Sequence, residues 1–341
     1  MPETPIHLGV DVGTQGVRCV AWREGGIVAR HTAPLRTANP QSGWATQNPE
    51  EIWAAFREAV GGTVAALGPD RSAVHGLGID ATASIFITAP DGRPLMDSIL
   101  WMDVRAEEYA RTIGALVGQP ESAELPWSKA LWLFEHRPDL FQSGNQLVEV
   151  ADWLIWRLTG QPVRSYASAL LKWHAASRSG LPEWAKLFPE VVELLPTRVV
   201  GVAEPVEVIQ PRAAESLGLP PGQVLVAGPI IDAYAGAIGS GALQNGTMAL
   251  ILGSSNCELF HGHDLPRQAG LWGPFADVYG LGLDVLEAGQ PSTGSVVRWV
   301  ERHFGHGLPL GELDRQAAAV APGSDGLKVF PAFQGVRSPW P

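Results

Sequence analysis

The stretch from residue 8 to residue 18, Leu-Gly-Val-Asp-Val-Gly-Thr-Gln-Gly-Val-Arg, restricts most strongly what this chain can fold into. An apolar strand reaches a carboxylate, Asp11, and leads through a turn into a second strand that carries Arg18. The turn offers small residues, a hydroxyl and an amide: Gly13, Thr14, Gln15 and Gly16. Carboxylate oxygens suit Mg²⁺, and backbone N–H groups in such a turn bind phosphate oxygens. The stretch indicates either a metal–phosphate site or an ordinary β-hairpin with an acidic surface residue.

Composition narrows the class of protein. With 341 residues the chain has room for about two domains, and 45% hydrophobic against 17% charged residues favours a sizeable core over disorder. The net charge of −11, without a cluster of Lys and Arg, argues against a nucleic-acid partner. Two distant cysteines, Cys19 and Cys257, exclude a disulfide framework and favour a reducing, cytoplasmic compartment. No secretory signal and no membrane-spanning stretch is visible, so no membrane partner is expected.

Apolar periodicity and turn signals predict alternating strands and helices. Residues 6–31 indicate a short antiparallel meander. Asn48 followed by Pro49 and Glu51 is typical of a capped helix start. The other expected elements are helices at 128–136, 147–158 and 233–242 and strands at 74–79, 85–88, 223–227, 248–253 and 257–260.

A later segment of the chain weakly resembles the opening hairpin in sequence. Val-Asp-Val-Gly-Thr-Gln at 10–15 compares with Leu-Ile-Leu-Gly-Ser-Ser at 250–255. Two similar strand–turn–strand units suggest two related halves that face one site. The boundary is expected near 235–247, with the Pro-rich stretch at 204–222 as a connector inside the first half.

The chain resembles the FGGY carbohydrate kinases, and within them the ribulokinase-like branch, from about residue 6 to its last residue. Nine segments in the family's order carry the resemblance, and together they make coincidence improbable. They are Asp11-Val-Gly-Thr-Gln-Gly-Val-Arg18, Trp44-Ala-Thr-Gln-Asn-Pro-Glu-Glu-Ile-Trp53, Gly78-Ile-Asp-Ala-Thr82, Leu100-Trp-Met-Asp-Val-Arg-Ala106, Asp152-Trp-Leu-Ile-Trp-Arg-Leu-Thr-Gly160, Ala227-Gly-Pro-Ile-Ile-Asp-Ala233, Leu252-Gly-Ser-Ser255, Glu287-Ala-Gly-Gln290 and Gly335-Val-Arg-Ser-Pro339.

Three features of the sequence favour pentulose kinases over glycerol or gluconate kinases. The segment 78–82 stands where xylulokinases usually carry a Gly-Gln pair, and the segments 171–173 and 287–290 resemble ribulokinases. The resemblance implies ATP- and Mg²⁺-dependent phosphorylation of a pentulose, with L- or D-ribulose as the first expectation. Xylulose or ribitol is the alternative substrate, and a non-catalytic sugar-binding or scaffold protein is the alternative function. The expected partner is a small-molecule sugar, and a homodimer stays open.

The resemblance also implies an α/β, actin/hexokinase-like fold built from two ribonuclease-H-like domains. An N-terminal domain over 1–240 would hold the sugar site and the first phosphate turn. A C-terminal domain over 241–341 would hold the second phosphate turn. We expect this second domain to be incomplete, because nothing here matches the Gly-Gly segment with which the family binds adenosine.

The same resemblance implies a role for each candidate residue. Asp232 is expected to be the general base, because a primary alcohol needs an acceptor for its proton; the alternative is a helix cap. Asp11 is expected to bind Mg²⁺, and Arg18 either contacts phosphate or pairs with an acid. The residues expected at ATP and Mg²⁺ are Asp11, Gly13, Thr14, Gln15, Arg18, Gly253, Ser254 and Ser255. Those expected at the sugar are Asp80, Thr82, Ala83, Lys172, Asp232 and Glu287.

Three further alternatives concern particular residues. The turn at 253–255 has a plain hairpin turn as its alternative. Lys172 has a surface lysine with a buried stem as its alternative, although its place between Leu171 and Trp173 favours a pocket. Asp103 and Arg105 are expected to form a structural ion pair.

Overall fold

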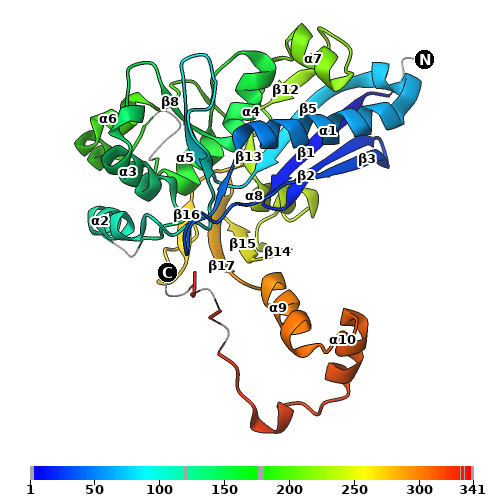
Figure 1. Ribbon diagram of the computed structural model, residues 1–341, viewed down its shortest axis with the longest axis vertical. Helices are drawn as coiled ribbons and strands as arrows, with labels where there is room; N and C mark the ends of the chain where they lie inside the picture. Colours follow the sequence, from blue (N-terminus) through cyan, green and yellow to red (C-terminus); the bar gives the residue numbers. More distant parts are fainter. Residues whose placement is uncertain (1–3, 119–120, 176–179, 331, 334, 339–341) are drawn as a thin grey trace. The chain divides into compact units, whose positions relative to one another are not determined.

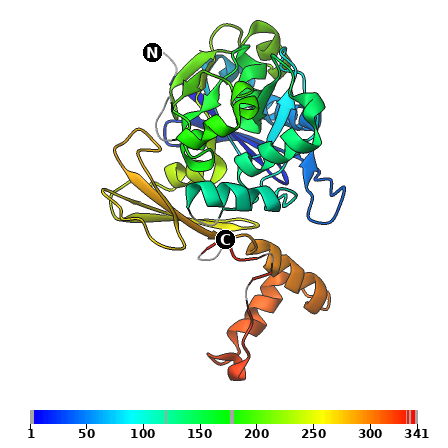
Figure 2. The same cartoon turned by 90° about the vertical axis from the view of Figure 1, so that its left-hand side faces the viewer.

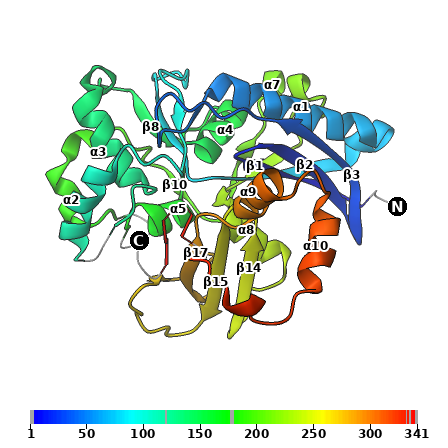
Figure 3. The same cartoon turned by 60° about the horizontal axis from the view of Figure 1, so that its bottom comes forward.

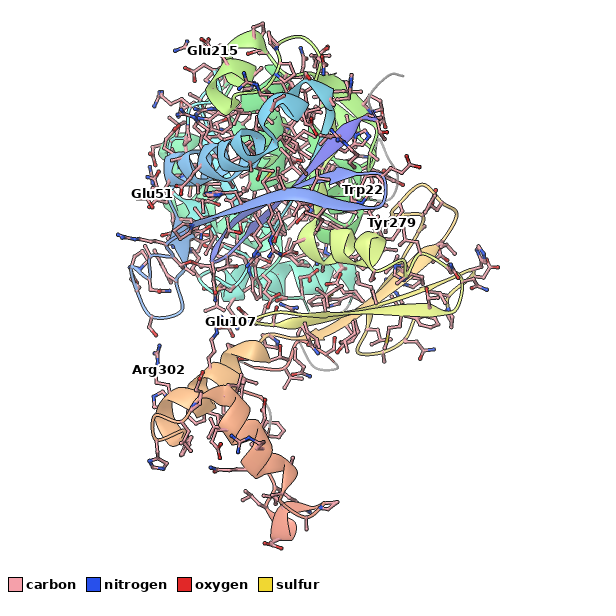
Figure 4. All side chains as sticks on the ribbon, turned by 90° about the vertical axis from the view of Figure 1, so that its right-hand side faces the viewer. Trp22, Glu51, Glu107, Glu215, Tyr279 and Arg302 are labelled. Atoms are coloured by element: carbon pink, nitrogen blue, oxygen red, sulfur yellow. The ribbon has the colours of Figure 1, made fainter. Side chains whose placement is uncertain are left out.

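The chain divides into two compact units. The computed structural model describes residues 4–118, 121–175, 180–330, 332–333 and 335–338 (Figure 1). The first unit comprises Met1–Ala235 and Phe275–Leu283, and the second comprises Gly236–Pro274 and Asp284–Pro341. The sequence did not indicate that 275–283 returns to the first unit. There Tyr279, labelled in Figure 4, contacts Tyr234 with 6.0 Å between the ring centroids.

The first unit is built on a mixed sheet with the strand order β11-β12-β5-β1-β2-β3, in which β13 also pairs with β5. Its strands are β1 Ile6–Gly13, β2 Gly16–Arg23, β3 Gly26–Pro34, β5 Val74–Ala81, β11 Pro205–Val208, β12 Leu225–Ala227 and β13 Ile230–Ile231. The first three strands are antiparallel neighbours, which confirms the predicted meander. β5 runs parallel to β1, and β12 and β13 run parallel to β5.

Three helices cover one face of this sheet: α1 Pro49–Leu67, α4 Val150–Thr159 and α7 Pro211–Leu217 (Figure 3). The α1 helix begins as predicted, because the side chain of Asn48 accepts hydrogen bonds from the backbone N–H groups of Glu50 and Glu51. Its buried side chains, such as Phe56 and Val60, join those of the strands in one apolar core. This core fixes the positions of the strand ends that carry the candidate residues.

A smaller sheet with the order β4-β7-β6-β8 forms the other part of the first unit. Its strands are β4 Thr46–Gln47, β6 Ile85–Thr88, β7 Ser98–Ile99 and β8 Gln146–Glu149. The helices α2 Glu107–Val117, α3 Pro126–His136, α5 Tyr166–Lys172 and α6 Pro189–Glu193 and the strands β9 Arg164–Ser165 and β10 Val199–Val200 complete the unit.

The predicted helix at 147–158 is wrong at its start. Residues 147–149 belong to β8, which pairs with β6, and the helix begins at Val150. The pairing of Val148 with Phe86 and of Leu147 with Ile87 decides the matter, because tertiary contacts override the local helical pattern.

The second unit contains a four-stranded sheet with the order β14-β15-β17-β16. Its elements are β14 Thr247–Leu252, β15 Asn256–Gly262, β16 Trp272–Phe275, β17 Asp284–Gln290, α9 Gly294–Phe304 and α10 Leu310–Ala318, and α8 Asp232–Gly239 joins it to the first unit. β14 and β15 form an antiparallel hairpin, as the sequence similarity to the opening hairpin predicted. Neither α9 nor α10, drawn in orange in Figure 2, buries any residue. Among the described residues, no helix has the length and apolar character that crossing a membrane requires.

Candidate active site

Three carboxylates of the first unit meet where neighbouring strands end. Asp11 near the end of β1 lies opposite Asp80 in the parallel strand β5. On the other side of β5, Ile230 of β13 lies opposite Asp80, and β13 ends directly before Asp232 (Figure 1). Because parallel strands place their carboxyl ends at the same edge, the sheet brings together three acids that are far apart in the sequence.

The electrostatics of Asp80 show how closely the acids interact. Burial raises the pKa of the Asp80 carboxyl well above its usual value, and the charges of Asp11 and Asp232 and a hydrogen bond with Asp11 raise this pKa further. Arg18 opposes the effect and donates from Nη1 to Oδ2 of Asp11 at 2.7 Å. Arg18 therefore pairs with an acid, one of its two predicted alternatives. The charged form of Asp80 is therefore disfavoured first by its burial and then by the two neighbouring negative charges.

The turn between β1 and β2 is held by neighbours on several sides. Nε2 of Gln47 donates to the carbonyl oxygen of Thr14 at 2.8 Å, and Nε1 of Trp101 donates to the Thr14 hydroxyl at 3.1 Å. A side chain at Gly16 would place its Cβ 2.7 Å from the carbonyl oxygen of Ala33, so the turn approaches β3 more closely than any other residue allows. The hydroxyl of Thr14 is thus presented in one defined position.

Asp232 stands at the junction of β13 and α8. One of its carboxylate oxygens accepts from the backbone N–H of the next residue, Ala233, at 2.7 Å, and its charge acts on Asp80. A helix cap accepts from an N–H two or three residues further on, so the base and the cap both stay predictions for Asp232. The segment before β13 is constrained as well, since a Cβ on Gly228 would lie 2.0 Å from the carbonyl oxygen of Gly201. Both contacts fix the direction in which the chain enters α8.

Lys172 ends the α5 helix and is 9% exposed. The stem of Lys172 is thus largely covered, and the pocket and the surface lysine both stay open as its interpretation. Ser165 caps α5 by accepting from the N–H of Ser168, and its hydroxyl donates to the carbonyl oxygen of Pro229 at 2.9 Å. The helix that carries Lys172 is therefore tied to the segment that leads to Asp232, and it packs against β13.

The other expected sugar residues of the first unit follow β5. Ala83 is buried, and the hydroxyl of Thr82 is hydrogen-bonded to that of Ser84 at 2.9 Å. The N–H of Thr82 also donates to the carbonyl oxygen of Val12 in β1, at 3.3 Å. The loop after β5 is thus attached to the strand that carries Asp11.

Asp103 and Arg105 form the predicted structural ion pair. Nε and Nη2 of Arg105 donate to the two oxygens of the fully buried Asp103 at 2.8 and 2.7 Å, and the N–H of Ala45 donates to the same carboxylate at 2.6 Å. The guanidinium group also lies 3.8 Å from the ring centroid of Trp44. With these partners in place, the pair holds the segment before α1 to the loop that contains Trp101.

Four candidate residues lie in the second unit. Gly253, Ser254 and Ser255 form the turn between β14 and β15, and the start of α9 is bonded to this turn: Gly294 N–H donates to the carbonyl oxygen of Gly253 at 3.1 Å. Glu287 lies in β17 and is 3% exposed. The roles expected for these four residues stay predictions.

Two residues with hydrogen bonds near the site were not among the predicted site residues. Trp101 occurs in a segment that carried the family resemblance, yet its bond to Thr14 links positions 87 residues apart. Lys129 is fully buried in α3, although it is a lysine. A signal for Lys129 existed, because it is followed by the apolar run Ala-Leu-Trp-Leu, the same kind of context that drew attention to Lys172.

The acids suit a metal ion that arrives with a phosphate compound. Within the described part of the chain, no three His, Cys, Asp or Glu side chains are arranged to hold a metal ion by themselves. Mg²⁺ usually keeps several waters and is bound through one or two carboxylates together with substrate phosphates. Asp11 at the strand edge, beside the turn of Thr14, offers that kind of donor.

The first unit's sheet, the two units and the acids at one sheet edge define an α/β protein of the actin/hexokinase-like class. The family described as the FGGY family of carbohydrate kinases, N-terminal domain, matches residues 6–239. The chain therefore belongs to the FGGY family.

Individual relatives agree with this assignment. A ribulokinase of Shouchella clausii is 28% identical over 97% of this chain and 68% of its own length. The FGGY carbohydrate kinase domain-containing protein of Homo sapiens is 28% identical over 85% of this chain and 59% of its length. The solved structure of a ligand-bound xylulose kinase from Lactobacillus acidophilus has a TM-score of 0.84 at 20% identity, covering 98% of this chain and 70% of that one. The chain spans about two thirds of the length of the curated relatives it matches.

Proposed function

We propose that this chain supplies the sugar site and the general base of an ATP-dependent sugar kinase whose substrate is a pentulose, with ribulose first. The observation that carries the proposal is the meeting of Asp11, Asp80 and Asp232 at one edge of the sheet. Ribulose is favoured because several of the curated relatives are ribulokinases, at 26–29% identity. Xylulose and gluconate kinases among the similar structures support the fold alone.

The chemistry assigned to Asp232 is proton acceptance. The sugar hydroxyl oxygen forms a bond to the γ-phosphorus of ATP while the bond from that phosphorus to the leaving ADP oxygen breaks, and the hydroxyl proton passes to the Asp232 carboxylate. The N–H of Ala233 holds that carboxylate in one orientation. Since phosphoryl transfer depends mainly on positioning and electrostatics, a fixed acceptor is what the reaction needs from this residue.

The other residues are assigned to binding. Asp11 would hold Mg²⁺, which when bound neutralises the negative charge of the phosphates. Thr14, Gln15 and the backbone of the turn would bind phosphate oxygens, as would the turn at 253–255 of the second unit. Lys172, Glu287 and the loop after β5, with Ala83, would bind the sugar hydroxyls, because a polyol needs both donors and acceptors.

The test is a coupled assay of ADP release with Mg-ATP against D-ribulose, L-ribulose, xylulose, ribitol and gluconate. We would run it on this chain and on any longer product of its gene. Asp232→Asn is expected to lower kcat by about 10²- to 10⁴-fold while the sugar Kd, measured by calorimetry, changes little. Asp91→Asn is the matched control, because Asp91 also accepts from a nearby backbone N–H, at 3.1 Å, but in an exposed turn.

The possible results separate the alternatives. Near-normal turnover of Asp232→Asn would show that another group accepts the proton. Sugar binding without a phosphorylated product in any form of the protein would favour a non-catalytic sugar-binding protein. A preference for xylulose or ribitol would retain the kinase and correct its substrate.

Location and assembly belong to the same proposal. Both cysteines, Cys19 and Cys257, are buried and do not form a disulfide with each other, which supports a reducing, cytoplasmic compartment. A homodimer is tested by light scattering of the purified protein.

A further inference from the structure

A chain of hydrogen bonds joins the β1–β2 turn to a lysine inside α3. Nζ of Lys129 donates to the carbonyl oxygens of Trp101 and Glu124, at 2.9 and 2.8 Å. The indole Nε1 of the same Trp101 donates to the hydroxyl of Thr14, at 3.1 Å. A side chain that is 0% exposed is therefore connected, through one residue, to a hydroxyl in the turn.

Trp101 is also held by its backbone N–H group. This N–H donates to the hydroxyl of Ser84 at 3.3 Å, and the hydroxyl of Ser84 is bonded to that of Thr82. Both serine and threonine belong to the loop that follows β5. The N–H, the carbonyl oxygen and the indole of Trp101 thus each have a partner in a different segment, which leaves the ring little freedom to turn.

The bond from Trp101 decides what the Thr14 hydroxyl can do. A hydroxyl has one hydrogen to donate and two lone pairs to accept, whereas an indole N–H can only donate. When Thr14 accepts from Trp101, its own hydrogen is available for another acceptor. Phosphate oxygens are acceptors, so the bond from the indole holds the hydroxyl oxygen in place while its hydrogen can point to a phosphate.

We propose that Trp101 and Lys129 are positioning residues for phosphate, Lys129 acting through Trp101 and Trp101 through the hydroxyl of Thr14. The proposal rests on the function proposed above, because it deepens the description of the same site. The proposal explains why a lysine is buried at position 129, which packing alone does not explain. A methionine would fill the same volume without the large free-energy cost of burying an amine.

The kinetics of Trp101 variants test the hydrogen bond from Trp101 to Thr14. Trp101→Phe keeps an aromatic side chain, although a smaller one, and removes the N–H, and we expect kcat to fall about tenfold, the effect of one lost hydrogen bond. Thr14→Val should lower kcat at least as much, and adding Trp101→Phe to it should change nothing further. The matched control is Trp153→Phe, which removes an indole bond to the carbonyl oxygen of Gly92 at 2.8 Å and should leave kcat unchanged. Losses that multiply in the double variant, or an equal loss in Trp153→Phe, would overturn the proposal.

Variants of Lys129 test whether its hydrogen bonds act through Trp101. Lys129→Met removes both hydrogen bonds, so kcat should fall as in Trp101→Phe, with no further loss when the two are combined. Lys129→Gln keeps a donor and should restore part of the loss, which a purely space-filling role would not predict. Normal turnover of Lys129→Met would remove the lysine from the proposal.

A measurement that needs no turnover separates this proposal from the proposed function. The ¹⁵N indole resonance of Trp101 is assigned by its loss in Trp101→Phe. Thr14→Val, Lys129→Met and saturating Mg-ATP are each expected to shift it. If no sugar is phosphorylated but Mg-ATP shifts this resonance, the positioning role stands without the kinase. If sugar is phosphorylated and the resonance is unchanged both in Thr14→Val and by Mg-ATP, the proposed kinase function is retained and the positioning role is refuted.

Discussion

Replacing Lys129 by methionine should change how the stability of the first unit depends on pH. Burial lowers the pKa of Lys129 from 10.5 to about 7, and the nearby acids Glu124, Asp103 and Glu149 only partly oppose this effect. Between these two pH values the unfolded chain keeps a proton that the folded chain has lost. The free energy of unfolding therefore rises with pH in this window, by about 1.4 kcal/mol for each pH unit.

The size of the effect follows from the same two values. A pKa lowered from 10.5 to about 7 corresponds to about 5 kcal/mol, gained as the pH rises through the window and complete near the pKa of the unfolded chain. The methionine variant lacks this dependence. The difference in unfolding free energy, wild type minus Lys129→Met, should then grow steadily with pH.

The assay is urea denaturation followed by tryptophan fluorescence, between about pH 7.5 and 9.5, where the predicted slope is largest. Trp127, Trp153 and Trp173 are buried in the first unit and report on its unfolding. Taking the difference between the two proteins cancels every other titrating group, including Tyr109, whose pKa is raised to about 12. A difference that stays constant across this range would show that Lys129 keeps its proton in the folded protein, and the reasoning from burial would fail.

Three further substitutions probe other parts of the first unit. Arg105→Ala leaves the buried charge of Asp103 without its ion pair and should lower the unfolding free energy, measured by urea denaturation, by about 3–5 kcal/mol. A loss below about 1 kcal/mol, the value for a surface ion pair, would contradict the contribution of a buried pair. Gly228→Ala forces a Cβ against the carbonyl oxygen of Gly201 and should destabilise the unit by about 1–3 kcal/mol in urea denaturation; an unchanged unfolding free energy would contradict the close approach. Asp80→Asn should raise the thermal midpoint at neutral pH, because the raised pKa of Asp80 makes its charged form unfavourable in the folded protein. This gain in thermal midpoint should vanish as the pH falls to about 3.8, the ordinary Asp value. A gain that does not depend on pH would contradict the pKa shift.

Local signals in the sequence were enough for the elements that depend on neighbouring residues. The meander over 6–31 follows from alternation and turn residues, and the start of α1 follows from the cap at Asn48. The hairpin of β14 and β15 was predicted in the same way. The family resemblance then supplied the fold that joins these pieces.

Long-range pairing explains what the sequence left open. Residues 147–149 look helical until β6 is available as a partner, and 275–283 returns to the first unit although a long stretch of chain separates it from the rest. The interaction of Asp80 with Asp11 and Asp232 depends on strand register, which no local pattern reveals. The bond from Trp101 to Thr14 has the same origin, since it joins residues that only the folded chain brings together.

The two helices α9 and α10 have a practical consequence for work with this protein. They contain 11 and 9 residues and bury none of them, while isolated helices shorter than about 12–15 residues are marginal in water. Trp299 and Phe304 are exposed on α9. A protease added at low concentration should therefore cut first in this segment, and the amides there should exchange with deuterium within seconds to minutes, long before those of β1 and β5. A sample trimmed in this way would keep Asp11, Asp80 and Asp232 on one stable body, and that body is the natural starting material for crystals.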